Sequence, residues 1–311
     1  MLKKVSIVLL SLVLLVVLGV SFLFGYNSNK ERLASNLTIK KGQNILQTAF
    51  LLEEHGLIKN RFRFALKAIL SQEYKEIKAG TYQFTNENEK EIIDKIKGGK
   101  ETLLEITIIP GQTTKDVAFL LQAQGLGNSQ DILEFLLSTS SEGFLFPDTY
   151  QIASQEALEN VVLRMRSNFK LKTKGLSFEE RSLLDTVKMA SLLEKEAQTE
   201  EDKRIIAGIL WKRLDNGILL EVDSALNYFI ASGGQTINSN PLLKELDSSY
   251  NTYKREGLPE TPICNPSLAS IEAALLPQET SYWFYLSSNE GEIFYAKTFD
   301  EHLINKAKYI Y

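Results

Sequence analysis

The sequence predicts an α+β protein behind an apolar N-terminal segment, and three observations support this. Residues 5–25 carry no charge, a strand–turn–helix pattern occurs twice, and strands and helices follow one another irregularly after it. A strictly alternating series would favour a parallel α/β sheet instead. The length of 311 residues is enough for two domains and an anchor.

The N-terminal segment predicts a membrane anchor. The sequence MLKK precedes VSIVLLSLVLLVVLGVSFLFG, which runs from Val5 to Gly25. A helix of about 20 apolar residues crosses a bilayer, and no small-residue cleavage site follows this one. We expect a cytoplasmic tail over residues 1–4, a single transmembrane helix over 5–25 and an extracytoplasmic chain from Tyr26, because Lys3 and Lys4 favour the cytoplasm.

Composition excludes several classes of function. The net charge of −4 argues against nucleic acid as a partner, because phosphate binding needs a basic surface. Cys264 is the single cysteine, so no disulfide forms within the chain. The two histidines, His55 and His302, lie far apart in sequence, and we expect neither a metal nor another cofactor.

The repeated pattern pairs residues 37–57 with residues 106–126 without a gap. Each copy has a β-branched stretch, a glycine turn at Gly42 or Gly111, and an apolar helical stretch that stops at Gly56 or Gly125. This predicts a duplicated β-α module. Between the copies, FRFALKAIL predicts a helix, residues 79–85 a strand, and EKEIIDKIKGGK a helix that ends at glycine.

Further elements follow the second copy. Helices are predicted at SQDILEFLLST, at EALENVVLRMRSNFKLKTKG and at EEDKRIIAGILWKRLDNG, then at SLASIEAAL before a terminal hairpin, YWFYLSSNEGEIFYAKTF. Pro147 interrupts EGFLFPDTY, where exposed Phe146 and Tyr150 would suit a sugar; a buried aromatic turn is the equal alternative.

A helix over residues 177–199 carries the most unusual residues, and Ser177 with Glu180 predicts its capping box. Its apolar residues go nearly all the way round, which indicates burial, yet SLLEKEA places Glu194 and Glu196 near its end. Two positions on a helix differ by about 200°, so the two carboxylates point apart. One can be reactive and the other structural, paired with Lys203, Arg204 or Arg213, and periodicity does not choose between them.

A carboxyl in an apolar cleft retains its proton towards neutral pH, as a general acid for glycosidic cleavage requires. Glu221 and Asp223, in LLEVDSALNY, are the other acidic candidates. Ordinary hydrolysis uses a second carboxylate of this kind. From the residues alone, a structural ion pair is the favoured interpretation.

An ordered set of motifs resembles the endolytic murein transglycosylases, the MltG/YceG-like family. The motifs are KAGTYQF (78–84), GFLFPDTY (143–150), MASLLEKEA (189–197), YNTY (250–253), GLP (257–259), ICNPS (263–267) and AKTFDEH (296–302). They span nearly the whole chain. The resemblance implies a membrane-anchored lytic transglycosylase, a lyase, with a LysM-like module at 26–104 and a YceG-like catalytic domain at 105–311.

The resemblance also implies residue roles. The second glutamate of the S-x-x-E-K-E motif, Glu196, would be the general acid/base, cleaving the MurNAc-β-1,4-GlcNAc bond with formation of a 1,6-anhydro ring. Peptidoglycan glycan strands would be the substrate, and proteins of cell-wall synthesis would be partners at the outer face of the cytoplasmic membrane. The remaining candidates for substrate binding are Ser191, Glu194, Glu221, Asp223, Asn251, Tyr253, Asn265, Phe146 and Tyr150.

The chain departs from the family pattern in three places: Glu221 to Ala225, Glu260 with Thr261, and Ile293. Asn251, Tyr253 and Asn265 match the pattern, although each could instead pin a loop through its own hydrogen bonds. Two alternatives to the transglycosylase remain. One is a peptidoglycan-binding scaffold whose catalytic site has decayed at Glu221 to Ala225, and the other is a hydrolase that uses Glu196, Asp223 and water.

Overall fold

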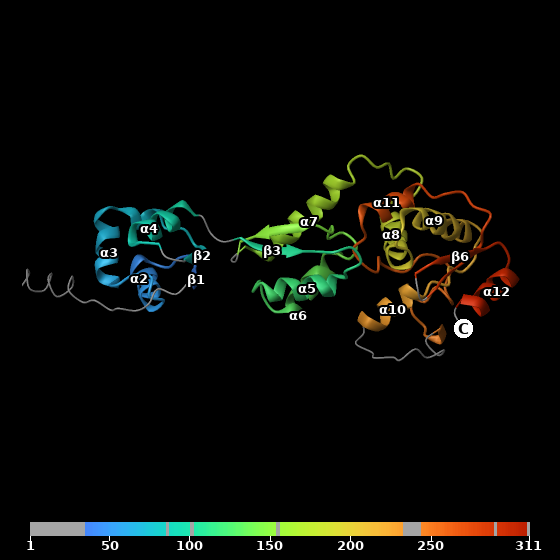
Figure 1. Ribbon diagram of the computed structural model, residues 1–311, viewed down its shortest axis with the longest axis horizontal. Coiled ribbons are helices and arrows are strands. Elements are labelled where there is room, and N and C mark those ends of the chain that lie inside the picture. Colours follow the sequence, from blue (N-terminus) through green and yellow to red (C-terminus); the bar gives the residue numbers. More distant parts are fainter. Residues whose placement is uncertain are drawn as a thin grey trace, which may run out of the picture. The chain divides into compact units, whose positions relative to one another are not determined.

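The computed structural model describes residues 35–84, 87–99, 103–153, 156–232, 244–288 and 291–309 (Figure 1). The predicted cytoplasmic tail (1–4) and transmembrane helix (5–25) lie outside these residues, and within them no helix has the length and apolar character of a membrane span. The described part combines α-helices with two-stranded sheets, so the α+β prediction is confirmed. The chain divides into two compact units, Met1–Leu104 with Gln151–Glu156 and Glu105–Tyr150 with Ala157–Tyr311.

The first unit is a strand pair covered by helices. Strand β1 (Ser35–Ile39) runs antiparallel to β2 (Gly80–Phe84), and between them lie α2 (Ile45–Glu54), α3 (Arg61–Leu70) and the 3₁₀ turn η1 (Glu73–Glu76). Helix α4 (Glu89–Gly98) follows β2 and ends at Gly99, whose φ is +63°. Leu37, Leu52, Tyr82, Phe84 and Ile92 share one buried core. The strand and helices predicted here are confirmed.

The second unit opens with the other copy of the repeat. Strand β3 (Leu104–Thr107) pairs with β4 (Thr149–Ile152), and the helices α5 (Thr114–Ala123), α6 (Ser129–Ser138) and α7 (Leu158–Lys172) belong to the same region. The turn glycines Gly42 and Gly111 have φ of +86° and +85°, and the helix-ending glycines Gly56 and Gly125 have +70° and +80°. The repeat predicted from sequence is therefore also a repeat of backbone conformation.

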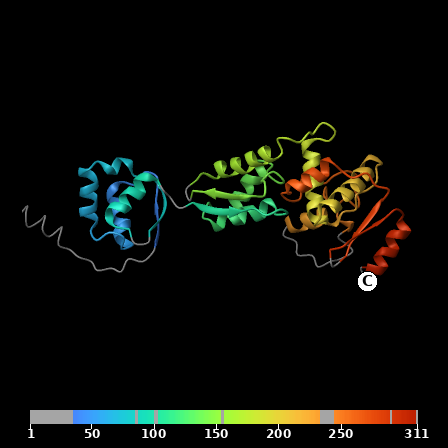
Figure 2. The ribbon, with the colours of Figure 1, turned by 45° about the horizontal axis from the view of Figure 1, so that its top comes forward.

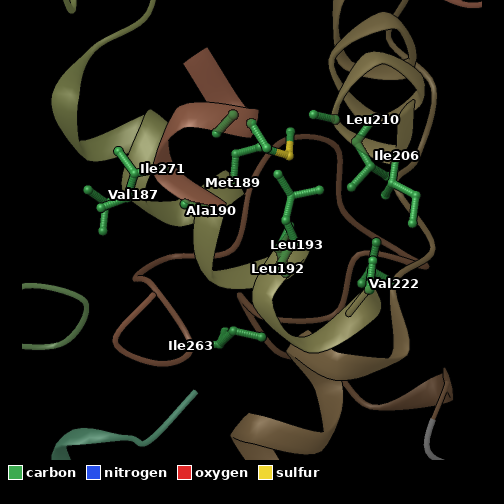
Figure 3. Packing of buried hydrophobic residues seen from close by; sticks show 14 of the residues in the cluster. Val187, Met189, Ala190, Leu192, Leu193, Ile206, Leu210, Val222, Ile263 and Ile271 are labelled. Atoms are coloured by element: carbon green, nitrogen blue, oxygen red, sulfur yellow. The ribbon is translucent and has the colours of Figure 1, made fainter. Parts of the chain in front are cut away.

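Helices pack around the end of α8 (Leu183–Glu196) in the rest of the second unit. Helix α9 (Glu200–Asp215) and α11 (Leu268–Leu275) contact it and each other, and α10 (Asp223–Ser232) contacts it as well (Figure 2). Figure 3 shows Leu192 and Leu193 in a single buried cluster with Ile206 of α9 and Val222. This packing fixes the position of the residues that follow Leu193.

The terminal hairpin is confirmed as β5 (Phe284–Ser287) and β6 (Ile293–Ala296), and α12 (Phe299–Tyr309) packs against both strands. The predicted capping box at Ser177 is wrong. Helix α8 begins at Leu183, and the Ser182 hydroxyl accepts from the Asp185 amide at 3.0 Å. Ser182 is therefore the N-cap of α8, and it satisfies one backbone amide of the first turn.

Candidate active site

Glu196 is the last residue of α8, and its side chain lines a cavity of about 450 Å³. The residue after it, Ala197, is extended at φ −141°, so the helix ends at the cavity wall. The wall combines α9, the turn into α10, the hairpin and α12. Its other residues are Arg213, Leu220, Glu221, Asp223, Lys244, Tyr253, Phe284, Tyr285, Leu286, Ser287, Phe299, His302 and Lys306.

The surroundings of Glu196 raise the pKa of its carboxyl. Burial is the main cause, and the charge of Asp223 adds to it. Ser224 and Tyr285 oppose the shift because they stabilise the ionised form; the Tyr285 hydroxyl donates to Oε2 of Glu196 at 3.2 Å. Glu196 forms no ion pair within the described residues. A carboxyl in this environment tends to hold its proton.

Glu194 lies in the opposite environment. Burial would raise its pKa, but the hydroxyls of Ser267 and Ser270, the Ser267 amide and Lys203 together lower it. Both hydroxyls donate to Oε2 at 2.6 Å, and Nζ of Lys203 lies 3.4 Å from Oε1. Glu194 is therefore a structural carboxylate that joins α8 to α9 and to the start of α11. Of the partners proposed from sequence, Lys203 is the one it contacts.

Glu221, Asp223 and Tyr253 all reach the cavity with Glu196. Glu221 has a left-handed φ of +56° and accepts from Nη2 of Arg213 at 2.6 Å, and the buried Arg213 guanidinium also lies over the Phe284 ring. The Tyr253 hydroxyl donates to Oδ1 of Asp223 at 2.6 Å. These contacts hold two acidic side chains beside Glu196 without using its proton.

Ser191, Asn251 and Asn265 are fully buried and bonded to backbone. The Ser191 hydroxyl accepts from the Ile263 amide at 3.0 Å. Nδ2 of Asn251 donates to the carbonyls of residues 244 and 246, and Asn265 links the carbonyl of Gln112 to the amide of Leu145. They are not among the described residues that line the cavity, and of these bonds only the one from Asn251 to the carbonyl of Lys244 reaches a residue that does.

Phe146 and Tyr150 are buried rather than exposed, at 6% and 5% of their surface. Phe146 packs on Phe169 and borders a different hollow from that of Glu196. The Tyr150 hydroxyl donates to the Phe146 carbonyl at 2.6 Å, and burial raises the Tyr150 pKa to about 12. The interpretation as a buried aromatic turn is confirmed, and the expectation of exposed rings is wrong.

Sequence reasoning missed several of the cavity residues. Tyr285 contacts Glu196 directly, and Phe299 and His302 come from a helix that was not predicted. Arg213, expected as a possible partner of Glu194 or Glu196, pairs with Glu221 instead. The signals available were the three consecutive aromatic residues of WFYL and the motif AKTFDEH. No cluster of metal-ligating side chains exists in the part of the chain that the structure describes.

Two proteins of known name are similar in sequence to almost the whole of this chain. The chain is 27% identical to an endolytic murein transglycosylase of Bacillus subtilis (strain 168), over 94% of this chain and 91% of that protein. It is also 27% identical to one of Streptococcus pneumoniae (strain ATCC BAA-255 / R6), over 96% of this chain and 64% of that protein's length.

A crystal structure of a YceG-like protein from Listeria monocytogenes superimposes with a TM-score of 0.58 at 26% identity, covering 88% of this chain and 99% of that one. The model of the YceG-like family matches residues 37–308, which include most of both units and every residue named above for the cavity. The chain therefore belongs to the YceG-like family.

Proposed function

We propose that this protein is a membrane-anchored, endolytic lytic transglycosylase of peptidoglycan. It cleaves the MurNAc-β-1,4-GlcNAc bond within nascent glycan strands and leaves 1,6-anhydro-MurNAc ends. Membership of the YceG-like family and the names of its relatives support the class of activity. The observation that carries the mechanism is a glutamic acid with a raised pKa at the wall of a cavity, and among the described residues this glutamic acid forms no ion pair.

Glu196 acts first as the general acid. Its proton passes to the oxygen that joins the two sugars, and the bond from that oxygen to the anomeric carbon of the muramic acid breaks. The carboxylate left behind is stabilised by the hydroxyl of Tyr285. It then accepts the proton of the muramic 6-hydroxyl, whose oxygen bonds to the anomeric carbon and closes the anhydro ring. Glu196 ends the cycle protonated, as it began.

One catalytic carboxyl suffices because the nucleophile belongs to the substrate. An attacking group already held near the reacting carbon has a high effective molarity, so no second carboxylate has to activate water. Asp223 then acts through charge: its negative charge raises the pKa of Glu196. Glu221, Asp223 and Tyr253 would meet the sugar as binding residues.

The parts of the chain have matching roles in this proposal. The LysM-like module at 26–104 holds glycan, and the catalytic domain at 105–311 cuts it. The helix over residues 5–25 spans the cytoplasmic membrane, with residues 1–4 inside and the catalytic domain outside. Cell-wall synthesis proteins are the partners that such a position suits, and no cofactor is required.

Reaction products separate the proposal from its two alternatives. The full-length protein is incubated with isolated peptidoglycan, and the released fragments are analysed by mass spectrometry. Anhydro ends support the transglycosylase, because they lack the water that hydrolysis adds. Reducing ends would instead support a hydrolase using Asp223, and glycan binding without cleavage would support a decayed scaffold.

A further inference from the structure

Helix α3 in the first unit is apolar on two opposite faces. One face carries Phe64, Ala65 and Ala68, which are buried in the unit's core. The other carries Phe62, Leu66, Ile69 and Leu70, which repeat at helical spacing and are 44–76% exposed. A surface helix of a soluble domain normally presents a polar face to water, so the second stripe indicates a partner.

Helix α2 extends this apolar surface. Leu46 and Phe50 are exposed at 52% and 47%, and the Arg61 guanidinium lies over the rings of both Phe50 and Phe62, 5.3 and 5.0 Å from their centres. The same side chains border a shallow hollow. The α2–α3 patch is defined here as Leu46, Phe50, Phe62, Leu66, Ile69 and Leu70.

We propose that the α2–α3 patch lies in the headgroup region of the membrane to which the chain is anchored. Aliphatic side chains form most of the patch, and these suit an acyl boundary better than a sugar. Arg61 and Lys67 are basic residues of α3, and such long side chains reach phosphates while their stems stay apolar. Arg61 forms an ion pair with Glu53 at 3.5 Å, and Lys67 forms one with Glu89 at 3.4 Å. The side chains are partly exposed, so both ion pairs are weak.

Chain length places the patch within reach of the bilayer. Nine residues, 26–34, separate the apolar run from β1. They span at most about 32 Å, and a unit of roughly 70 residues has a radius of gyration of about 11 Å. A tether this short gives the patch a high effective concentration at the surface, so weak intrinsic affinity is sufficient. This inference rests on the proposed anchor and not on the chemistry of Glu196.

The test uses the full chain in nanodiscs of phosphatidylcholine and phosphatidylglycerol. Native Cys264 is buried and its pKa is raised by burial, so a new surface cysteine is labelled preferentially. A nitroxide is attached in a Leu66→Cys variant and, as matched control on another exposed helical position of the same unit, in Asp94→Cys. Collisions with oxygen, which enters lipid, are compared with those of a water-soluble nickel chelate.

The proposal expects the Leu66 label to have a several-fold higher ratio of oxygen to nickel accessibility than the Asp94 label. Equal, nickel-dominated accessibility at both positions would overturn it. Protection of the Leu66 label from both reagents would overturn the proposal and indicate that a protein covers the patch. Protection that appears only when glycan is added would also overturn it and indicate that the patch binds sugar. A chain that fails to enter nanodiscs would remove the anchor and the proposal together, whereas loss of activity in Glu196→Gln leaves the label result unchanged.

Discussion

Nζ of Lys203 lies 3.4 Å from Oε1 of Glu194, and the two side chains are only 7% and 10% exposed. This pair ties α8 to α9 within one turn of the residue that we assign to catalysis. Because a buried cation left without its partner is costly, the pair fixes the end of α8 more firmly than a surface ion pair would. The pair therefore also fixes the position of Glu196, two residues further along the helix.

Glu194→Gln is expected to lower stability by about 1–3 kcal/mol while catalysis per folded molecule is retained. Because the pKa of Glu194 is lowered in the folded state, its contribution to the free energy of unfolding is present above the unfolded-state pKa. This contribution is lost as pH falls through the folded-state pKa. Denaturant titration followed by the fluorescence of Trp211 and Trp283, both in the second unit, measures the loss. A double variant with Lys203→Met should be less damaged than the sum of the single variants, and strict additivity would contradict the pairing.

Tyr285→Phe is expected to move the pH profile of activity upwards. The tyrosine hydroxyl stabilises ionised Glu196, so its removal raises the pKa of the catalytic carboxyl further. The alkaline limb of kcat/KM, where the general acid loses its proton, then lies at higher pH. An unchanged limb, or one displaced to lower pH, would show that this hydroxyl does not act on the catalytic proton.

Asp223→Asn is expected to move the same limb in the opposite direction. The charge of Asp223 raises the pKa of Glu196, and the amide removes that charge at nearly constant size. Anhydro products should persist at a reduced rate, because Asp223 is not the nucleophile in this account. Complete loss of cleavage, together with reducing ends from the wild-type chain, would favour the hydrolytic alternative.

Glu142 provides a prediction on stability away from the cavity. Its buried carboxyl accepts from the Thr114 amide at 3.0 Å and from the Tyr228 hydroxyl at 2.9 Å, and burial raises its pKa to about 7. The folded state therefore holds this proton more tightly than the unfolded state does. The contribution of Glu142 to the free energy of unfolding is complete below the unfolded-state pKa. It is lost as pH rises through the folded-state pKa of about 7, and the total loss is about 3 kcal/mol.

Glu142→Gln should flatten this pH dependence. The comparison is the unfolding free energy at about pH 5 and about pH 8, read again from Trp211 and Trp283. The wild type should lose stability between the two pH values, and the variant should lose much less. A variant with the same decline as the wild type would place the responsible group elsewhere.

The first unit could be predicted from sequence because its signals are local. Asn44 and Asn88 cap the N-termini of α2 and α4, and Gly42, just before α2, and Gly99, just after α4, adopt the left-handed conformation. Capping and turn chemistry depend on a few consecutive residues, so the sequence contains them in full. The repeat at Gly42 and Gly111 follows from the same chemistry.

Local sequence signals could not show which of Glu194 and Glu196 is structural and which is the proposed proton donor. The groups that hold Glu194 ionised, Ser267 and Ser270, lie more than 70 residues further along the chain. Helix α10 was not predicted, although its buried residues, Ala225, Leu226 and Ile230, fall on one side of the helix. Helix α12 has no buried residue among those described, so its sequence lacks the buried apolar stripe by which a helix is predicted.

The most direct measurement is the end-group composition of glycan fragments produced by Glu196→Gln, beside wild type and beside Glu194→Gln as a control on the same helix. Folding of each variant is verified by circular dichroism before digestion. We predict that wild type and the control release fragments with anhydro-muramic ends and that the Glu196 variant, although folded, releases none. Anhydro ends formed by folded Glu196→Gln at the wild-type rate would contradict the assignment of the proton donor.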